Sequence, residues 1–417
     1  MSVAVESSAS RLLGWWGAGS VQARRALVAA TLGWMLDAFD VTLFAMTLPA
    51  VRVSLGLSAT AAGVLGSVTL VAGAAGGLVF GWIADRFGRT RALMLSVIVY
   101  SVFTAACGLA QDFRQLMAAR VFLGFGMGGE WASGAALVSE SWAAEHRGKA
   151  LGLMQSGWAV GYAAAALVNG LIQPAYGWRA VFFVGILPAF LTIWIRRRVE
   201  EPPIWRSREV VTSAASGIRR LFERPLARLT IALTFMNACT LFAWWGFYLW
   251  LPSYLVQPVS QGGVGLQLLS SSGFILVMQS GMWVGYVTFG FVSDALGRKP
   301  TYVGYLIMAA ALLTVFLSTR NAMLLLALGP FVAFFATGYF SGFGAVTAEI
   351  YPTAIRATAQ GFTYNIGRLA SALAPFTVGT LAQTHGFGTA LSLSSGAFVL
   401  AAVTWIWIPE TRGRSLQ

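Results

Sequence analysis

The chain has 417 residues, of which 57% are hydrophobic and only 10% are charged, and it carries a formal net charge of +13. Soluble domains contain about 25% charged residues, so this composition excludes an ordinary soluble domain and indicates a protein that crosses a membrane many times. Its two cysteines lie in apolar segments and its two histidines in loops, which leaves almost nothing from which to build a disulfide, a metal site or a Cys/His or Ser/His catalytic centre.

Apolar windows of about 20 residues predict six helices in each half of the chain. In the first half they cover 26–48, 60–83, 92–110, 114–137, 149–171 and 179–195. In the second half they cover 227–250, 268–291, 301–318, 322–346, 357–380 and 388–408. The predicted fold is therefore an all-α membrane protein with twelve transmembrane helices in two six-helix bundles. The predicted divisions are an N-terminal segment 1–25, a first bundle 26–195, a linker 196–226, a second bundle 227–408 and a tail 409–417.

One loop motif occurs twice at a constant spacing. GWIADRFGRTR begins at Gly81 and GFVSDALGRKP begins at Gly290, 209 positions later. The same spacing relates five pairs of charged residues: Asp85 and Asp294, Arg89 and Arg298, Glu140 and Glu349, Arg147 and Arg356, and Glu201 and Glu410. Because this spacing is half the chain length, we interpret the two halves as tandem copies of one unit, related by a pseudo-twofold axis.

The basic residues gather on one side of the predicted topology. Of the 28 Lys and Arg, only Arg52, Arg114, Arg179 and Arg320 fall in loops on the side away from the N-terminus. The positive-inside rule therefore predicts that both termini lie in the cytoplasm, in a bacterial-type inner membrane. We interpret the net charge as a topology signal and expect no nucleic-acid partner. The Arg-rich linker is expected to contact lipid headgroups.

The sequence contains no motif for an internal energy source. An ATP-driven pump needs a Gly-rich phosphate loop that ends in Gly-Lys-Ser/Thr. The only lysines, Lys149 and Lys299, do not lie in such a loop. We therefore expect an ion gradient to drive any transport.

Five ionisable residues fall inside predicted spans: Asp37, Asp40, Arg120, Glu130 and Arg368. Such groups cost about 2.5–3.5 kcal/mol each on the insertion scale, so they are expected to face a cavity and to have a function. Asp37 and Asp40 are three residues apart and share one helix face. We assign proton coupling to Asp37, Asp40 and Glu130 as a group. Alternatively, one Asp pairs with a cavity Arg and only fixes the packing.

Arg368 is the main candidate for substrate binding. Its planar guanidinium matches a carboxylate in a bidentate geometry, which suits an anchor for an organic anion. Alternatively it pairs permanently with Asp37 or Glu130, or substrate and acid compete for it, so that protonation of the acid frees the Arg. The other substrate-binding candidates are Tyr364, Asn365, Gln155, Gln279 and Arg120. Arg120 could instead assist proton transfer through Glu130 or serve the packing of its helix. Weaker candidates are Trp158, Asn237, Trp244, Trp245 and Tyr339.

Several motifs resemble those of a known family. The duplicated loop, Arg120 followed by Gly124 and Gly128, and PETRGRSL from Pro409 resemble the major facilitator superfamily. Four further segments resemble its metabolite:proton symporters, a group that includes transporters of lactate and other monocarboxylates, sialic acid and aromatic acids: GWMLDAFDVTLF, GGEWASGAALVSE, EHRGKALGLMQSGWAVGY and YNIGRLASALAP. The resemblance implies the major facilitator fold.

The resemblance also implies a cytoplasmic gate formed by the duplicated loops. Its residues would be Asp85, Arg89, Glu140 and Arg147, with Asp294, Arg298, Glu349 and Arg356. We expect their contacts to cross between the bundles and to form in one state only. Alternatively these charges only maintain the shape and orientation of the loops.

These observations together predict a secondary transporter rather than an enzyme. We expect proton-coupled uptake of a small organic anion, a monocarboxylate in the first instance, by alternating access, with the proton as coupling ion and without a cofactor or metal. The expected partners are the anion and membrane lipids, and the expected state is a monomer. The alternatives are a proton-coupled exporter of a drug or metabolite, uptake of an aromatic or sugar acid by the same mechanism, and a non-transporting sensor, for which no segment is long enough to form a soluble domain.

Overall fold

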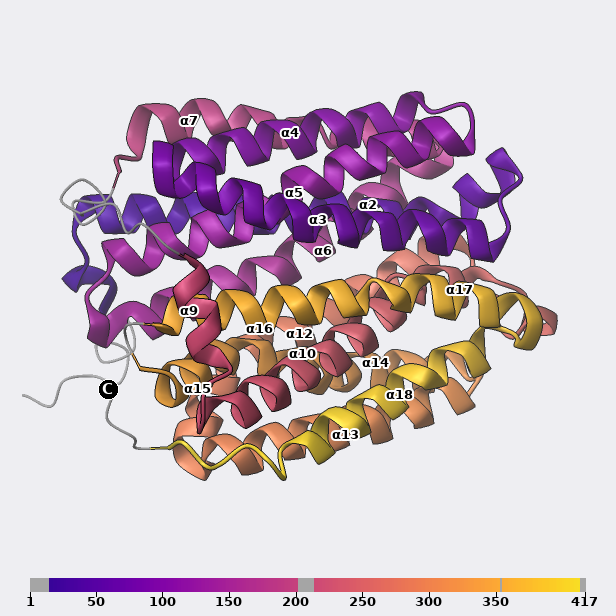
Figure 1. The fold of residues 1–417 in the computed structure, drawn as a ribbon. Helices are drawn as coiled ribbons and strands as arrows, with labels where there is room; N and C mark the ends of the chain where they lie inside the picture. Colours follow the sequence, from indigo (N-terminus) through magenta and orange to yellow (C-terminus); the bar gives the residue numbers. More distant parts are fainter. Residues whose placement is uncertain (1–14, 202–213, 353–354, 413–417) are drawn as a thin grey trace, which may run out of the picture.

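The computed structural model describes residues 15–201, 214–352 and 355–412, and helices are the only regular elements in these ranges. Figure 1 shows two groups of helices lying against each other, the first half of the chain in indigo to magenta and the second in orange to yellow. The start of α2, the linker helix α9 (Ala214–Leu221) and the C-terminal segment lie at one end of both groups. We call this end the terminal face.

The first half contains the six predicted crossings. Its elements are α2 (Val21–Leu55), α3 (Ala59–Phe87), α4 (Arg89–Leu109), α5 (Phe113–Ser141), α6 (Ala144–Val184), the 3₁₀ turn η1 (Leu187–Phe190) and α7 (Leu191–Arg198). Within α6, Gly177 has φ 76° and ψ 174°, which is not helical and interrupts the helix. Because that interruption lies between the predicted helices 149–171 and 179–195, α6 contains one crossing and the start of the next.

The second half repeats this arrangement. Its elements are α10 (Leu226–Tyr248), α11 (Leu251–Val256), η2 (Val259–Gln261), α12 (Leu268–Leu296), α13 (Arg298–Ser318), α14 (Ala322–Gly338), η3 (Tyr339–Gly342), α15 (Phe343–Ile350), α16 (Arg356–Ser371), α17 (Leu373–His385) and α18 (Phe387–Thr404). Ten stretches of the described chain are long and apolar enough to cross a membrane. One of them contains the Gly177 interruption, and the pair α16 and α17 adds a further crossing, so the count agrees with the predicted twelve.

Several helices begin at a side-chain cap. The Ser20 and Ser58 hydroxyls accept from the backbone N–H groups of Ala23 and Ala61, and Asp112 and Asn321 cap α5 and α14 in the same way. Such caps satisfy donors that have no partner within the helix. The two helices that follow the duplicated loop, α4 and α13, begin instead at Gly88 and Gly297, which have no side chain to offer.

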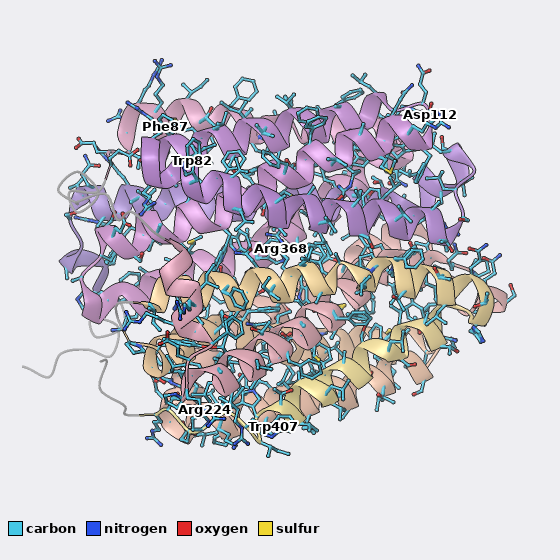
Figure 2. All side chains as sticks on the ribbon, in the orientation of Figure 1. Trp82, Phe87, Asp112, Arg224, Arg368 and Trp407 are labelled. Atoms are coloured by element: carbon cyan, nitrogen blue, oxygen red, sulfur yellow. The ribbon has the colours of Figure 1, made fainter. Side chains whose placement is uncertain are left out.

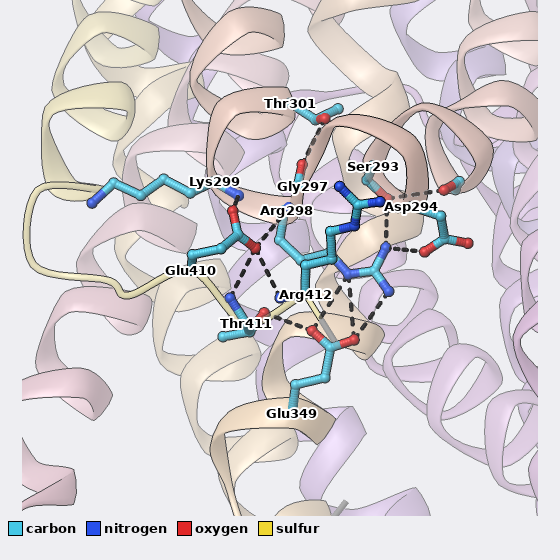
Figure 3. Close-up of polar contacts among 11 residues, drawn as sticks. Ser293, Asp294, Gly297, Arg298, Lys299, Thr301, Glu349, Glu410, Thr411 and Arg412 are labelled. Atoms are coloured by element: carbon cyan, nitrogen blue, oxygen red, sulfur yellow. Dashed lines mark hydrogen bonds and ion pairs between the residues drawn. The ribbon is translucent and has the colours of Figure 1, made fainter. Parts of the chain in front are cut away.

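Glutamates far along the chain supply the missing caps. The Glu201 carboxylate accepts from the N–H groups of Arg89 at 2.7 Å and Thr90 at 3.0 Å. Its repeat partner Glu410 accepts from those of Arg298 at 2.9 Å and Lys299 at 3.0 Å (Figure 3). A negative charge at a helix N-terminus is also favoured by the helix dipole.

The duplicated glycines make room for these glutamates. Gly88 has φ 118° and Gly297 has φ 105°, both in the region that favours glycine. A Cβ on Gly88 would lie 2.3 Å from a Glu201 carboxylate oxygen, and one on Gly297 would lie 2.8 Å from a Glu410 oxygen. The repeated Gly-Arg dipeptide is therefore the N-terminus of a helix shaped to receive a carboxylate.

Replacement of Glu410 by Ala should destabilise the second half by about 0.5–2 kcal/mol, the usual cost of losing an N-cap. Partial burial raises the pKa of Glu410, but four backbone N–H donors lower it by more, so its pKa lies below the ordinary value. The stabilisation is thus complete above the ordinary glutamate pKa and is lost as the pH falls through the lower folded-state pKa. Melting temperatures of detergent-solubilised wild type and Glu410→Ala should differ at neutral pH and converge in acid. The exposed Glu223, replaced by Ala, is the control; a difference that persists unchanged in acid would contradict the assignment.

Candidate functional site

Five ionisable side chains are buried within the helices. Their exposed fractions are 1% for Asp37, 0% for Asp40, 2% for Arg120, 0% for Glu130 and 7% for Arg368. They come from α2, α5 and α16, and Figure 2 shows Arg368 where the two halves face each other. The structure therefore places all five predicted residues away from solvent, as the sequence predicted.

Glycines bring the helices of the site into backbone contact. A Cβ on Gly76 of α3 would lie 1.9 Å from the Phe125 carbonyl oxygen of α5, and one on Gly161 of α6 would lie 1.8 Å from the Met35 carbonyl oxygen of α2. Any larger residue at these positions would force the helices apart. The charged side chains thus lie within a closely packed frame.

Other glycines leave room for the charged groups themselves. A Cβ on Gly33 of α2 would lie 2.5 Å from Glu130 Oε1, and one on Gly73 of α3 would lie 3.0 Å from Arg368 Nη2. Arg368 belongs to the second half, so the absence of a side chain at Gly73 leaves space in the first half for a side chain of the other bundle.

Asp40 and Arg120 form one electrostatic group inside the first half. Thr104 donates a hydrogen bond of 3.1 Å to Asp40 Oδ2, and Asp40 is the acidic neighbour of Arg120. The Arg120 guanidinium lies over the Phe44 ring, 4.0 Å from its centroid. Asp40 is therefore the acid that interacts with Arg120. Ten residues of α5, about 15 Å of helix rise, separate Arg120 from Glu130, whereas Asp40 approaches from α2.

Asp37 connects the halves electrostatically. Arg368 is its charged neighbour from the second half, and Glu130 is its neighbour from α5. The Arg368 side chain makes no hydrogen bond to any described residue, and its Nε is buried without a partner. One carboxylate oxygen of Asp37 and both of Glu130 are also buried without partners. Buried polar groups are normally paired, so these atoms are available to a water molecule or to a bound ligand.

Two other predicted residues meet through Trp131. Trp131 Nε1 of α5 donates 3.2 Å to Gln155 Oε1 of α6, and the Trp131 ring stacks on Tyr364 of α16 at 4.8 Å and 18°. Asn365 lies beside Tyr364, and its side-chain N–H donates to the Gly361 carbonyl at 3.0 Å. Gln155 and Tyr364 therefore belong to one contact chain that crosses between the halves near Arg368.

A cluster of aromatic rings also crosses between the halves. Trp34 and Trp158 of the first half pack with centroids 4.6 Å apart, and Trp158 meets Trp244 of the second half at 5.6 Å. Trp244 in turn contacts Trp245 at 4.9 Å and Tyr248 at 4.8 Å. The indole N–H groups of Trp34, Trp158 and Trp244 are buried without partners. We call these five residues the aromatic cluster.

Sequence reasoning missed Trp34 and Trp131, although a signal was present. Trp34 precedes Asp37 by three residues and Trp131 follows Glu130 directly. The predicted residue Gln279 is buried on α12, with its Nε2 bonded to the Ile275 carbonyl at 3.3 Å and its Oε1 without a partner. No described contact connects Gln279 with Arg368 or with the buried acids.

The duplicated loops form ion pairs within each half. Arg89 pairs with Glu140 at 2.9 Å, and Arg298 pairs with Glu349 at 3.0 Å and also with Asp294 (Figure 3). Both described Arg–Glu pairs join elements of one half. The expectation that these pairs cross between the bundles is therefore wrong for them. The reason is the packing of α4 on α5, and of α13 beside α15, within a half. The side chains of Asp85, Arg147 and Arg356 lie outside the described residues.

Hydrogen bonds between the halves occur from the middle of the molecule to the face opposite the terminal face. The described ones join Thr60 to Gln383 at 2.9 Å, Ser67 to the Phe376 N–H at 3.2 Å, Asn169 to Ser272 at 3.3 Å and Tyr162 to the Tyr248 carbonyl at 3.1 Å. All four come from regions nearer the far face than the helix ends that carry the duplicated loops. The two halves are thus joined at the far face.

The sequence matches known proteins along its whole length. The family model described as the Major Facilitator Superfamily matches residues 30–287 and 259–416. A probable 4-methylmuconolactone transporter of Cupriavidus pinatubonensis is 36% identical over 97% of this chain and 95% of its own. A putative metabolite transport protein of Haemophilus influenzae is 33% identical over 94% and 98%, and the sialic acid transporter NanX of Escherichia coli is 30% identical over 92% and 93%.

The fold matches solved transporters as well. The partially occluded inward-open conformation of the xylose transporter XylE from E. coli superposes with a TM-score of 0.77 at 21% identity, covering 95% of this chain and 100% of that one. The family and these relatives are transporters and not enzymes, and several carry organic acids. This chain, with its two halves of six crossings and its duplicated loop, belongs to the Major Facilitator Superfamily.

Proposed function

We propose that the protein takes up a small organic anion together with a proton, by alternating access between its two halves. The observation that carries this proposal is Arg368: the residue is 7% exposed, lies where the halves meet, and its side chain makes no hydrogen bond to a described residue. A buried charge of this kind needs a partner, and a carboxylate matches its planar fork. A substrate bound there contacts both halves at once.

The aromatic cluster at the junction of the two halves favours a flat, unsaturated acid within the class of small carboxylates. The aromatic cluster offers ring faces and edges from both halves, and aromatic rings prefer offset or edge contacts with other flat groups. Its three unpaired indole N–H groups can donate to a polar group on the substrate. Several relatives agree with this class, since they include a probable 4-methylmuconolactone transporter, a cis,cis-muconate transport protein and a putative niacin/nicotinamide transporter.

The proton is proposed to act through Asp37. The Asp37 carboxylate interacts electrostatically with both Arg368 and Glu130. The substrate carboxylate and the Asp37 carboxylate would therefore compete for one guanidinium. Protonation of Asp37 would free Arg368 to bind the anion. Asp40, Thr104 and Arg120 would form a supporting group deeper within the first half. One proton carried with one monocarboxylate moves no net charge, so the pH difference would drive uptake more than the voltage.

The distribution of basic residues supports a terminal face that lies in the cytoplasm of a bacterial inner membrane. The hydrogen bonds between the halves then lie toward the outside. In this proposal the described arrangement is closed to the outside, and the duplicated loops with their Arg–Glu pairs belong to the cytoplasmic gate.

Replacement of Arg368 by Ala should abolish acid-driven uptake at ordinary substrate concentrations. Loss of a charged hydrogen-bonding partner, worth about 1.5–3 kcal/mol, corresponds to a roughly 10- to 150-fold weaker apparent affinity. The measurement is the internal pH of dye-loaded proteoliposomes as a panel of carboxylic acids is added outside, with protein-free liposomes correcting for passive entry. Arg368→Lys should restore part of the signal, and Arg114→Ala, an exposed arginine at the far face, should behave as wild type. Full uptake by Arg368→Ala, or no signal from wild type across the panel, would refute the proposal.

Replacement of Asp37 by Asn should separate binding from coupling, because the amide resembles the protonated acid. We expect Asp37→Asn to exchange labelled substrate across the membrane at equal concentrations but to lose accumulation driven by a pH difference. Asp40→Asn is the matched comparison three residues away, and it should keep pH-driven accumulation. If Asp40→Asn alone loses accumulation, the assignment of the proton to Asp37 is wrong.

A further inference from the structure

A groove lies on the outer surface of the second half, between α10 and the end of α18. It has a volume of about 560 Å³, which is within the range of about 300–1,000 Å³ typical of ligand sites. Its lining residues are Arg228, Ile231, Ala232, Phe235, Thr404 and Trp407. Ile231, Phe235 and Trp407 are 61%, 49% and 44% exposed, so the groove opens away from the transport site.

The groove changes from charged to apolar along one face of α10. Arg228, Ile231, Ala232 and Phe235 are spaced i, i+3, i+4 and i+7, so they form a single stripe. Arg228 lies in the first turn of the crossing Leu226–Val256, and Phe235 lies about 10 Å further along the helix axis. The charged end of the groove is therefore at the membrane surface and its apolar end is inside the hydrocarbon.

The positive charge at the surface end has no partner among the residues that the structure describes. Arg228 is exposed and its side chain makes no ion pair or hydrogen bond with the described residues, and the same is true of Arg224 just before α10. Figure 2 labels Arg224 and Trp407 at the same corner of the molecule. Trp407 follows the last residues of α18, at the level where tryptophans commonly lie beside lipid headgroups.

We propose that this groove is a binding site for an anionic phospholipid. The lipid phosphate would bind the Arg228 guanidinium, which suits a phosphate in a bidentate geometry. One acyl chain would lie along Ile231, Ala232 and Phe235. Basic pockets between transmembrane helices bind anionic headgroups in this way. A zwitterionic lipid fills the same apolar stripe but carries its own positive group, which is repelled by Arg228. This site is independent of the substrate and of the direction of transport.

The test is native mass spectrometry of the full chain in detergent after incubation with phosphatidylglycerol or with phosphatidylcholine of the same acyl chains. Wild type should retain one phosphatidylglycerol more than Arg228→Ala, which should bind this lipid roughly tenfold more weakly, as expected for loss of one charged contact. Ile231→Trp fills the groove from an exposed position and keeps the charge, so it should also lose the retained lipid. Arg91→Ala removes an exposed arginine at the start of α4, on the same face of the other half, and should retain it.

Three outcomes would overturn the proposal. The first is equal retention of phosphatidylglycerol by wild type and Arg228→Ala, and the second is equal retention of the two lipids by wild type. The third is a loss in Arg91→Ala as large as that in Arg228→Ala, which would mean that the surface charge in general attracts the lipid. Melting temperatures of all variants close to that of wild type show that any loss arises in the groove and not from misfolding.

Discussion

Within a membrane there is no water to hydrogen-bond a charge or a backbone polar group, so the protein itself must supply its partners. The arrangement of this chain follows from that constraint. Two arginines and three acids are buried among its described helices, and they are held in two sets of neighbours: Arg120 with Asp40, and Arg368 with Asp37 and Glu130. The first set lies inside one half. The second joins the two halves, and it leaves donors and acceptors without partners among the described residues.

The same constraint explains where glycine occurs. At Gly33 and Gly73 the missing side chain leaves space for Glu130 and Arg368, and at Gly76 and Gly161 it lets helices touch through their backbones. At Gly88 and Gly297 it lets a distant glutamate reach the first N–H groups of a helix. Glycine in this chain thus leaves space for charged side chains as well as allowing helices to pack closely. A substitution at Gly73 would displace Arg368, whereas one at Gly76 would change the spacing of α3 and α5.

Much of the fold follows from sequence because apolar length and exact repetition are strong signals. The spans and the five charged residues inside them were predicted from the sequence, which also contains the duplicated loop. Glu201 and Glu410 occupy equivalent positions in the two repeats, and this is now explained because each carboxylate caps a helix of its own half. The break between α16 and α17 depends on local backbone geometry at Ala372, which hydropathy does not detect, whereas the interruption at Gly177 falls between the predicted helices 149–171 and 179–195. Which acid lies beside which arginine depends on the rotation of the helices about their axes, so the interaction of Arg120 with Asp40 could not be read from the sequence. Trp34 and Trp131 were missed because a tryptophan in an apolar span more often serves packing, although both lie close in sequence to buried acids. The roles of the site residues in transport stay predictions.

The capping glutamates have a mechanical consequence. Glu201 lies just beyond the last helix of the first half and Glu410 just beyond that of the second, and each binds the start of the third crossing in its own half. In each half, the segment that follows the last helix is therefore hydrogen-bonded to the start of the third crossing. A force applied through the linker would act on the hydrogen bonds of Glu201 before it acts on any crossing helix of the first half. These hydrogen bonds hold the third to sixth crossings of each half together at the terminal face, and a polypeptide cut in the linker after Glu201 would keep both sets of them.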